Sequence, residues 1–134
     1  RLVRDWSSDV CSSDLYEEAE SIWADGAYVD AIDSFREYIK VYPGEYHAYK
    51  RIAEIYEKDL GSFRAAALEY EEMLEMDIPK SRWGWAAIHL CNLYSGKLDD
   101  SDRALALLQR VANECSETTA GQKARDRLAK IAAG

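Results

Sequence analysis

GAYVDAIDSFREYIKVYP, residues 26–43, is the stretch that decides the fold of this chain. Its large apolar residues recur every three or four positions, and this spacing places side chains along one face of an α-helix. Pro43 then ends the helix, because proline has no N–H with which to continue the hydrogen-bond ladder. The stretch therefore predicts one amphipathic helix that packs against a neighbour.

The apolar stripe of this helix recurs twice further along the chain. The three copies are Tyr28, Ala31, Ile32, Phe35, Tyr38 and Ile39; Phe63, Ala66, Ala67, Tyr70, Met73 and Leu74; and Ala104, Leu105, Leu108, Val111 and Ala112. A second pattern precedes each of the last two copies and consists of Tyr49, Ile52, Ala53 and Tyr56, then of Ala87, Leu90, Cys91 and Tyr94. Strand signals are nearly absent. The pattern indicates a repeated helix-turn-helix unit, and we predict an all-α chain.

The residues at fixed positions of this unit resemble the tetratricopeptide repeat (TPR) family. In that family the second helix shows Gly-x-Tyr-x-x-Ala-x-x-x-Phe, with Pro eight residues after the last aromatic. The residues of this chain at that spacing are Gly26, Tyr28, Ala31, Phe35 and Pro43. YKRIAEIY, residues 49–56, is similar to the first-helix pattern Trp-x-x-Leu-Gly-x-x-Tyr, with Tyr in place of Trp and Ala in place of Gly.

The resemblance implies an α-α superhelix, which is a right-handed TPR-like solenoid of about three helix-turn-helix repeats with a C-terminal capping helix. The chain departs from the family pattern at Glu18, where Leu is expected, and by extra residues at 59–61. Side-chain oxygens suited to helix N-caps occur at Asp100 or Ser101 and at Ser116 or Thr118. We predict helices at about 16–25, 28–42, 46–59, 62–77, 80–95, 101–115 and 118–132.

Residues 1–15 require a separate interpretation. WSSDVCSSDL, residues 6–15, can be back-translated to TGG AGT TCA GAC GTG TGC TCT TCC GAT CT, a common sequencing-library adapter. The alternative is a natural arm rich in Ser and Asp. We interpret residues 1–15 as a non-native segment and residues 16–134 as the TPR-like helical repeat domain. On this interpretation the true N-terminus is missing, together with any signal peptide or lipid anchor.

Composition and charge exclude several classes of function. The chain has 17 Lys and Arg against 25 Asp and Glu, a formal net charge of −8, so nucleic acid is an unfavourable partner. No apolar run approaches the roughly 18 residues of a membrane-spanning helix. The 2 His and 3 Cys are too scattered for a zinc site or a disulfide framework. We therefore expect no metal, no cofactor and no membrane span.

Catalytic arrangements are not evident in the sequence. His89 and Cys91 are two positions apart on a predicted helix and point away from each other, so they cannot share a proton. Carboxylates need a low-dielectric cleft to act as an acid and base pair, and those of this chain are expected on solvated helix faces. They are Glu17, Glu18, Glu20, Glu69, Glu71, Glu72 and Glu75. The chain is predicted not to be an enzyme.

The resemblance also implies a concave groove lined by the first helix of each repeat. By register with the family, the expected lining is Tyr16, Glu20, Trp23, His47, Lys50, Glu54, Glu57, Trp85, Ile88 and Asn92. Exposed aromatic residues beside polar ones are typical of peptide-binding surfaces. The alternative is that the Trp residues fill gaps between repeats. Some TPR domains bind a C-terminal carboxylate, but this chain lacks the matching residues, and Glu20 would repel such a group.

We predict a non-enzymatic interaction module that binds a peptide or partner helix in the concave groove. Because Glu20, Glu54 and Glu57 are expected in the lining, the partner should be neutral or basic and carry an apolar anchor. Two alternatives remain: a structural scaffold or oligomerisation segment of a longer chain, and a regulatory fragment of an enzyme whose catalytic part is missing. The run ETTAGQKARDRLAKI is similar to the ends of bacterial envelope repeat proteins. It implies a bacterial source and leaves a cytoplasmic or periplasmic location open.

Overall fold

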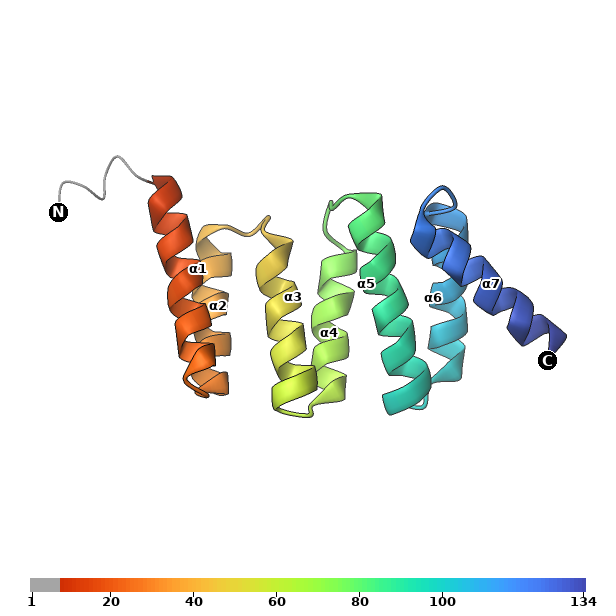
Figure 1. Cartoon of the computed structure of the whole chain (residues 1–134), viewed down its shortest axis with the longest axis horizontal. Helices are drawn as coiled ribbons and strands as arrows, with labels where there is room; N and C mark the ends of the chain where they lie inside the picture. Colours follow the sequence, from red (N-terminus) through yellow and green to blue (C-terminus); the bar gives the residue numbers. More distant parts are fainter. Residues whose placement is uncertain (1–7) are drawn as a thin grey trace.

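The computed structural model describes the backbone of residues 8–134 and the side chains of residues 14–134, and this part contains seven α-helices and no strand (Figure 1). The prediction of an all-α chain is therefore confirmed. The helices are α1 (Ser8–Ala24), α2 (Tyr28–Val41), α3 (Tyr46–Glu54), α4 (Phe63–Leu74), α5 (Lys80–Asn92), α6 (Ser101–Glu114) and α7 (Thr119–Ala133). Short π-helical turns extend two of them, η2 (Ile55–Asp59) after α3 and η3 (Leu93–Lys97) after α5. None of the described helices is both long enough and apolar enough to cross a membrane.

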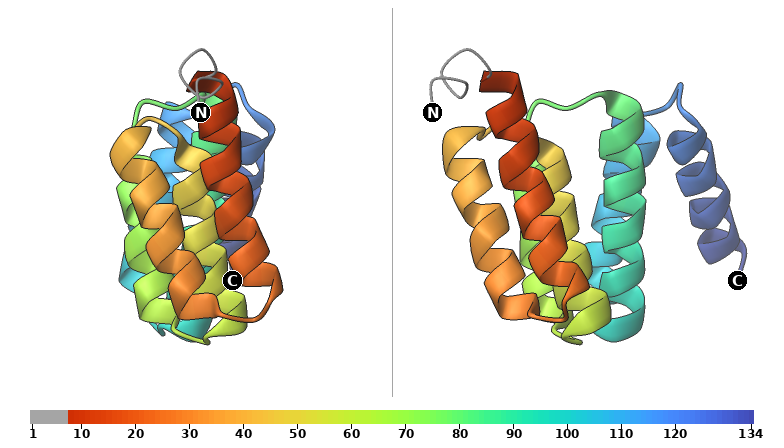
Figure 2. Two further views of the ribbon diagram at one scale, coloured as in Figure 1. Left: turned by 90° about the vertical axis from the view of Figure 1, so that its left-hand side faces the viewer. Right: turned by 60° about the vertical axis from the view of Figure 1, so that its left-hand side comes forward.

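Consecutive helices form hairpins that stand side by side in a row. Helix α1 packs on α2, α3 on α4 and α5 on α6, while α2 with α3 and α4 with α5 join one hairpin to the next. The two views in Figure 2, together with Figure 1, show α1 and α7 at opposite ends of this row. Helix α7 packs on α6 and α5 and covers the last hairpin. Each unit thus contacts mainly its neighbours in the sequence.

The observed helix boundaries lie close to the predicted ones, except at α1. This helix begins at Ser8 instead of residue 16, so it continues across the boundary that the adapter interpretation assigns. Extending an existing helix by one residue costs far less than starting one, which explains why α1 need not stop there. Leu15 is half-buried and packs against the first core cluster. Residues 1–7 of the segment interpreted as adapter lie outside the described residues.

Side-chain caps mark the beginnings of α6 and α7. The Asp100 carboxylate accepts a hydrogen bond from the Arg103 backbone N–H at 3.2 Å, and the Thr118 hydroxyl accepts one from the Gly121 N–H at 3.0 Å. Each bond satisfies a backbone donor that has no partner within the helix. The sequence offered two alternatives for each of these N-caps, and the structure has Asp100 and Thr118 in that position.

The turn inside each hairpin has a residue in the left-handed backbone region at the same place. Gly26 (φ 87°), Gly61 (φ 65°) and Asp99 (φ 53°) each stand two residues before the second helix of a hairpin begins. Glycine adopts this conformation freely because it has no Cβ, and aspartate is among the residues that tolerate it best. The extra residues at 59–61 are therefore accommodated without loss of the turn geometry.

Two clusters of buried side chains form the core. The first joins α1, α2 and α3 around the fully buried Phe35 and Ile52. The second runs from α3 to α7 and includes Trp83, whose indole N–H donates to the Leu74 carbonyl at 2.9 Å. The residues of the predicted stripes are buried or half-buried, except Leu105 of α6, which is exposed. Leu107 of α6, which was not part of the predicted stripe, is buried.

Glu69 was expected on a solvated face, and this expectation is wrong. The residue is 8% exposed and its carboxylate lies 2.7 Å from the Arg36 guanidinium, which joins α4 to α2 of the preceding hairpin. The hydrogen bond to Glu69 raises the pKa of Arg36, so the guanidinium stays charged and compensates the buried carboxylate. The Glu69 carboxylate, predicted on an outer face, therefore joins two hairpins through its ion pair with Arg36.

Replacing Phe35 by Ala should lower the free energy of unfolding by about 3–5 kcal/mol, because the ring is fully buried and its removal leaves a cavity. Urea denaturation followed by circular dichroism measures the change. Glu72→Ala is the control, since Glu72 is exposed on α4 and its loss should change the free energy by no more than about 0.5 kcal/mol. Equal losses at the two positions would contradict the helix register.

Gly61→Ala should destabilise the fold by about 1–2 kcal/mol, because a side chain at this positive φ is strained. Crowding cannot contribute, since no atom of the described residues lies within 4 Å of the added Cβ. Gly44→Ala is a matched substitution with equal space and no positive φ, and it should be close to neutral. A thermal melt of both variants that shows equal destabilisation would refute the assignment of the turn position.

Candidate functional site

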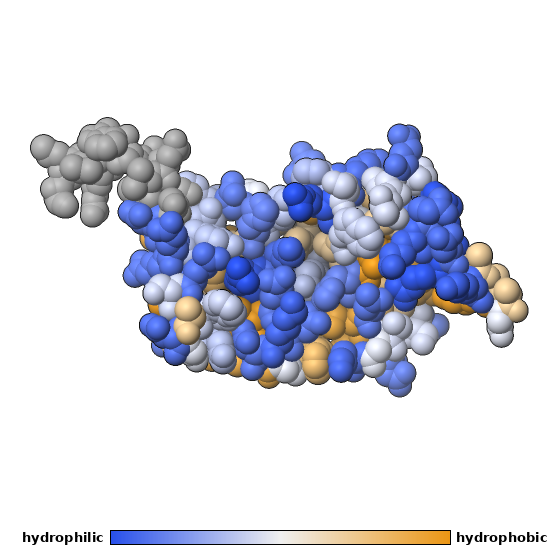
Figure 3. All heavy atoms as spheres, viewed as in Figure 1, coloured by the Kyte–Doolittle hydropathy of each residue, from blue (hydrophilic) through white to orange (hydrophobic). Residues whose placement is uncertain are grey.

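A cavity of about 360 Å³ lies near the middle of the row, between α3, α4 and α5. We call it the central cavity. Figure 3 shows the molecule from the direction of Figure 1: hydrophilic residues cover most of this face, and hydrophobic residues are visible in the seams between them. The central cavity is lined by Tyr46, His47, Lys50, Glu54, Lys58, Tyr70, Met73, Arg82, Trp85, Ala86 and His89.

The inner wall of the central cavity is apolar and aromatic. Tyr70 and Met73 of α4 are buried there, whereas Trp85 of α5 is 45% exposed. The rings of Tyr70 and His89 are 5.0 Å apart, and the His89 Nε2 lies 2.7 Å from the Glu57 carboxylate, within hydrogen-bonding distance. Burial, and then the nearby carboxylates, raise the pKa of Tyr70, so its phenol is neutral at physiological pH.

Four of the residues expected in the groove line this cavity, namely His47, Lys50, Glu54 and Trp85. A fifth, Glu57, is not part of the lining, but its carboxylate lies within hydrogen-bonding distance of His89, which is. The four lining residues lie together because α3 and α5, the first helices of consecutive hairpins, both border the central cavity. Four residues that the register of the repeat grouped together therefore line one cavity in the structure.

The expected groove residues of α1 are engaged by Arg51 of α3. The Arg51 guanidinium forms ion pairs with Glu20 at 3.1 Å and Glu54 at 3.4 Å, and it lies 5.3 Å from the centre of the Trp23 ring. The Trp23 indole N–H donates to the Asp59 carboxylate at 2.7 Å. At this end of the row the side chains bind one another, and Trp23 fills the space between two hairpins.

Tyr16 is half-buried and packs against the first core cluster. Its ring makes edge contacts with Phe35 and Tyr38, each at a centroid distance of 5.3 Å. Burial, followed by the negative charge of Glu20, raises the pKa of Tyr16. Because the ring packs on α2, it does not line the central cavity.

Ile88 and Asn92 are also absent from the cavity lining, because α7 covers their side of α5. Ile88 is 3% exposed, and the Asn92 side-chain oxygen accepts a hydrogen bond from Arg127 of α7 at 2.9 Å. The helices approach closely here, since a Cβ added at Gly84 would lie only 2.8 Å from the Cβ of Ala120. The capping helix therefore occupies the part of the groove that these residues were expected to line.

The expectation of a neutral or basic partner assumed that the carboxylates of the groove are free. Glu20 and Glu54 instead share Arg51, and Glu57 is hydrogen-bonded to His89. Such pairing removes most of the repulsion toward a carboxylate that the sequence suggested for Glu20. These ion pairs form because α3 contributes a cation, Arg51, that reaches Glu20 of α1.

Sequence reasoning missed the α5 stripe that faces the cavity. Arg82, Trp85, Ala86 and His89 line it with the i, i+3, i+4, i+7 spacing of one helix face, and only Trp85 was expected. This stripe was detectable in the sequence as a second face of α5. Tyr46, Lys58, Tyr70 and Met73 were also missed, because they reach the cavity from a helix end, a π-helical turn and the core stripe of α4.

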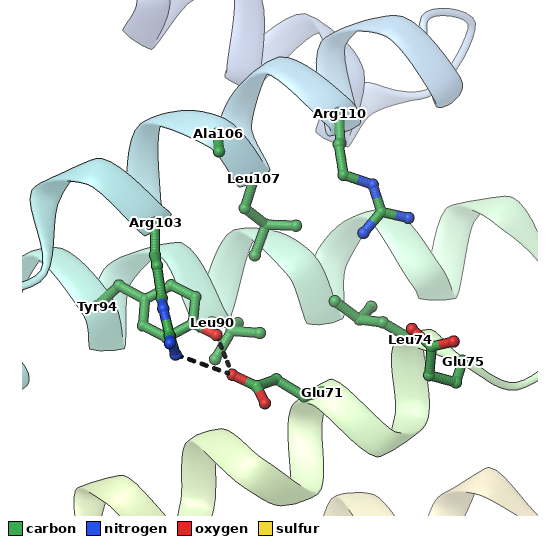
Figure 4. Close-up of a pocket in the computed structure, with 9 residues that line it drawn as sticks. All are labelled: Glu71, Leu74, Glu75, Leu90, Tyr94, Arg103, Ala106, Leu107 and Arg110. Atoms are coloured by element: carbon green, nitrogen blue, oxygen red, sulfur yellow. Dashed lines mark hydrogen bonds and ion pairs between the residues drawn. The ribbon is translucent and has the colours of Figure 1, made fainter.

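A second cavity of about 400 Å³ lies between α4, α5 and α6 (Figure 4). Figure 4 shows Tyr94 and Arg103 pointing toward Glu71, which accepts a hydrogen bond from the Tyr94 hydroxyl. Arg103 lies 3.9 Å from the same carboxylate, and Arg110 forms an ion pair with Glu114. Although this cavity is slightly larger, both of its arginines are engaged in ion pairs and none of its lining residues is an exposed aromatic, so the central cavity is the better candidate for a binding site.

Neither a metal centre nor a known relative identifies the site. Among the residues whose side chains are described, no group of three or more His, Cys, Asp and Glu is placed to hold a metal ion. Cys91 and Cys115 are both buried as free thiols. Comparison of the sequence with protein-family models and with curated proteins finds no match. The function must therefore be inferred from the geometry of the chain itself.

The stability of the fold should decrease at alkaline pH. Burial and the hydrogen bond to Glu71 raise the pKa of Tyr94 from 10.0 to about 12. Between these values the folded chain binds more protons than the unfolded one, so the free energy of unfolding falls as pH rises through about 10 to 12. Denaturant unfolding over this range should show a shallower fall for Tyr94→Phe, which lacks the titrating group. Identical pH profiles for the two proteins would contradict this account.

Proposed function

We propose that the chain is a TPR-like right-handed solenoid that binds a segment of a partner protein, and that the central cavity accepts an apolar side chain of that segment. The repeated stripes, the hairpins stacked in a row and the left-handed residue at the same place in each turn support the solenoid. The Gly, Tyr, Ala, Phe and Pro spacing in residues 26–43 supports the TPR assignment.

The observation that carries the binding proposal is the exposed Trp85 beside a buried apolar wall. A large aromatic side chain in water is unfavourable, and here it lies at a cavity whose inner wall is formed by Tyr70 and Met73. Ligand sites are typically concave, mostly apolar and edged by a few polar groups. An aliphatic or aromatic side chain of a partner would be covered by Trp85 on one side and by α4 on the other.

We also propose that the binding involves no covalent chemistry. Burial raises the pKa of the Cys91 thiol to about 11, so it is protonated and unreactive at neutral pH. Its Sγ lies 3.6 Å from the Ala104 carbonyl, to which it is directed within the core. His89 contacts Glu57 and Tyr70, and Tyr70 is held neutral by burial, so the central cavity lacks an activated nucleophile.

A structural scaffold is the second candidate function, and exposed apolar residues on the outer helices favour it. Val29 and Val41 of α2 and Ile131 of α7 are each more than half exposed, and these helices belong to the two ends of the row. Surfaces of this kind can pack against further chain or a second molecule. The scaffold needs no ligand in the central cavity, which separates it from the first proposal.

Binding of short peptides that differ only in one central residue tests the proposed function. Peptides with a central Leu or Phe should bind the full chain more tightly than the peptide with Gly, as measured by anisotropy of a fluorescent label on the peptide. Trp85→Ala should weaken the binding by about 1–2 kcal/mol, because it removes one wall of the cavity.

Val29→Ala is the control, since Val29 is exposed on α2, a helix that contributes nothing to the cavity. This variant should bind as the original chain does. Failure of every peptide to bind would overturn the proposal and favour the scaffold.

A further inference from the structure

The edge of the central cavity carries three basic side chains without an ion-pair partner. Lys50 comes from α3, Lys58 from η2 and Arg82 from α5, so they surround the cavity from both neighbouring helices. No carboxylate of the described residues lies within ion-pair distance of any of them, whereas Arg36, Arg51, Arg103 and Arg110 elsewhere are all paired. Three free cations therefore lie together where the apolar wall is exposed.

Among the described residues that line the cavity, three are basic and one, Glu54, is a carboxylate. Glu54 forms an ion pair with Arg51 at 3.4 Å, and Glu57, behind His89, is hydrogen-bonded to that ring at 2.7 Å. The remaining polar groups of the lining are the imidazoles of His47 and His89 and the phenols of Tyr46 and Tyr70. None of these contributes negative charge at neutral pH. The local balance at the cavity is thus positive.

We propose that the partner segment is acidic, with carboxylates on either side of the apolar side chain that enters the cavity. This inference rests on the proposed function and specifies its ligand. The apolar side chain packs against Trp85 and Met73, and the flanking carboxylates pair with Lys50, Lys58 and Arg82. Opposite charges at the edge of an interface speed association and select against wrong partners.

The overall charge of −8 does not oppose this inference. Exposed charges are screened over about 8 Å at physiological ionic strength, so a bound peptide responds chiefly to the groups at the cavity edge. The acidic side chains of the chain lie mostly elsewhere, and α4 alone displays Glu71, Glu72 and Glu75 away from the cavity. At low salt the net charge slows the approach of an acidic peptide, whereas the edge cations stabilise the complex once it has formed.

Three labelled peptides with the same central Leu and with flanks of Asp and Glu, of Ser and Asn, or of Lys and Arg test the inference on the full chain. The acidic peptide should bind most tightly, and added salt should weaken its binding more than that of the neutral peptide. Lys50→Gln and Arg82→Gln should each reduce its affinity about 2- to 5-fold and leave the neutral peptide unaffected. Circular dichroism confirms that each variant is folded.

Lys130→Gln is the matched control, because it removes the same charge from an exposed position on α7 that is outside the cavity lining. It should leave all three affinities unchanged, and an effect as large as that of Lys50→Gln would overturn the inference. Equal or tighter binding of the basic peptide would also overturn it, while leaving the proposed function intact. Failure of all three peptides to bind would overturn both.

Discussion

Close approach of neighbouring helices is the constraint on which the rest of this structure depends, and small side chains at repeated positions permit it. Ala31, Ala66 and Ala104 occupy the same place in three successive hairpins and are all buried. At the junction with the capping helix the requirement is stricter, because Gly84 and Ala120 leave no room for another Cβ. A single hairpin would expose its apolar face to water, so each unit is stable only when the next covers it.

This stacking also determines which of the residues expected in a groove remain open to a ligand. At the α1 end, Arg51 holds Glu20 and Trp23 against α3. At the other end, α7 lies over Ile88 and Asn92. The space between α3 and α5 is lined at its base by α4 and has no further helix to cover it. The register predicts a groove that runs along three hairpins. In the structure, the expected residues that stay together line one cavity in the middle of the row.

The charge of the cavity follows from pairing and not from composition. The chain contains more acidic than basic residues, and the register places Glu20, Glu54 and Glu57 in the groove. In the folded chain Arg51 forms ion pairs with Glu20 and Glu54, His89 is hydrogen-bonded to Glu57, and three cations without an ion-pair partner line the cavity. Side chains from α1, α3 and α5 take part in this pairing. Their distances depend on how the hairpins stack, so the amino-acid counts alone do not give the charge of the site.

The sequence by itself determined the helical class, the order of the hairpins and most of the core. Apolar spacing depends only on the geometry of one helix, and the proline, glycine and cap positions depend only on local backbone chemistry, so both can be derived from neighbouring residues. The same register grouped His47, Lys50, Glu54 and Trp85, which line one cavity in the structure.

Only the tertiary structure decided which predicted surfaces stay exposed and which charges are free. Glu69 became buried because Arg36 reaches it from another hairpin, and Ile88 became buried because α7 turns back over α5. Both outcomes depend on contacts between residues more than 30 positions apart, such as the Arg36–Glu69 pair separated by 33. No local pattern encodes such contacts, because they arise from the packing of whole helices.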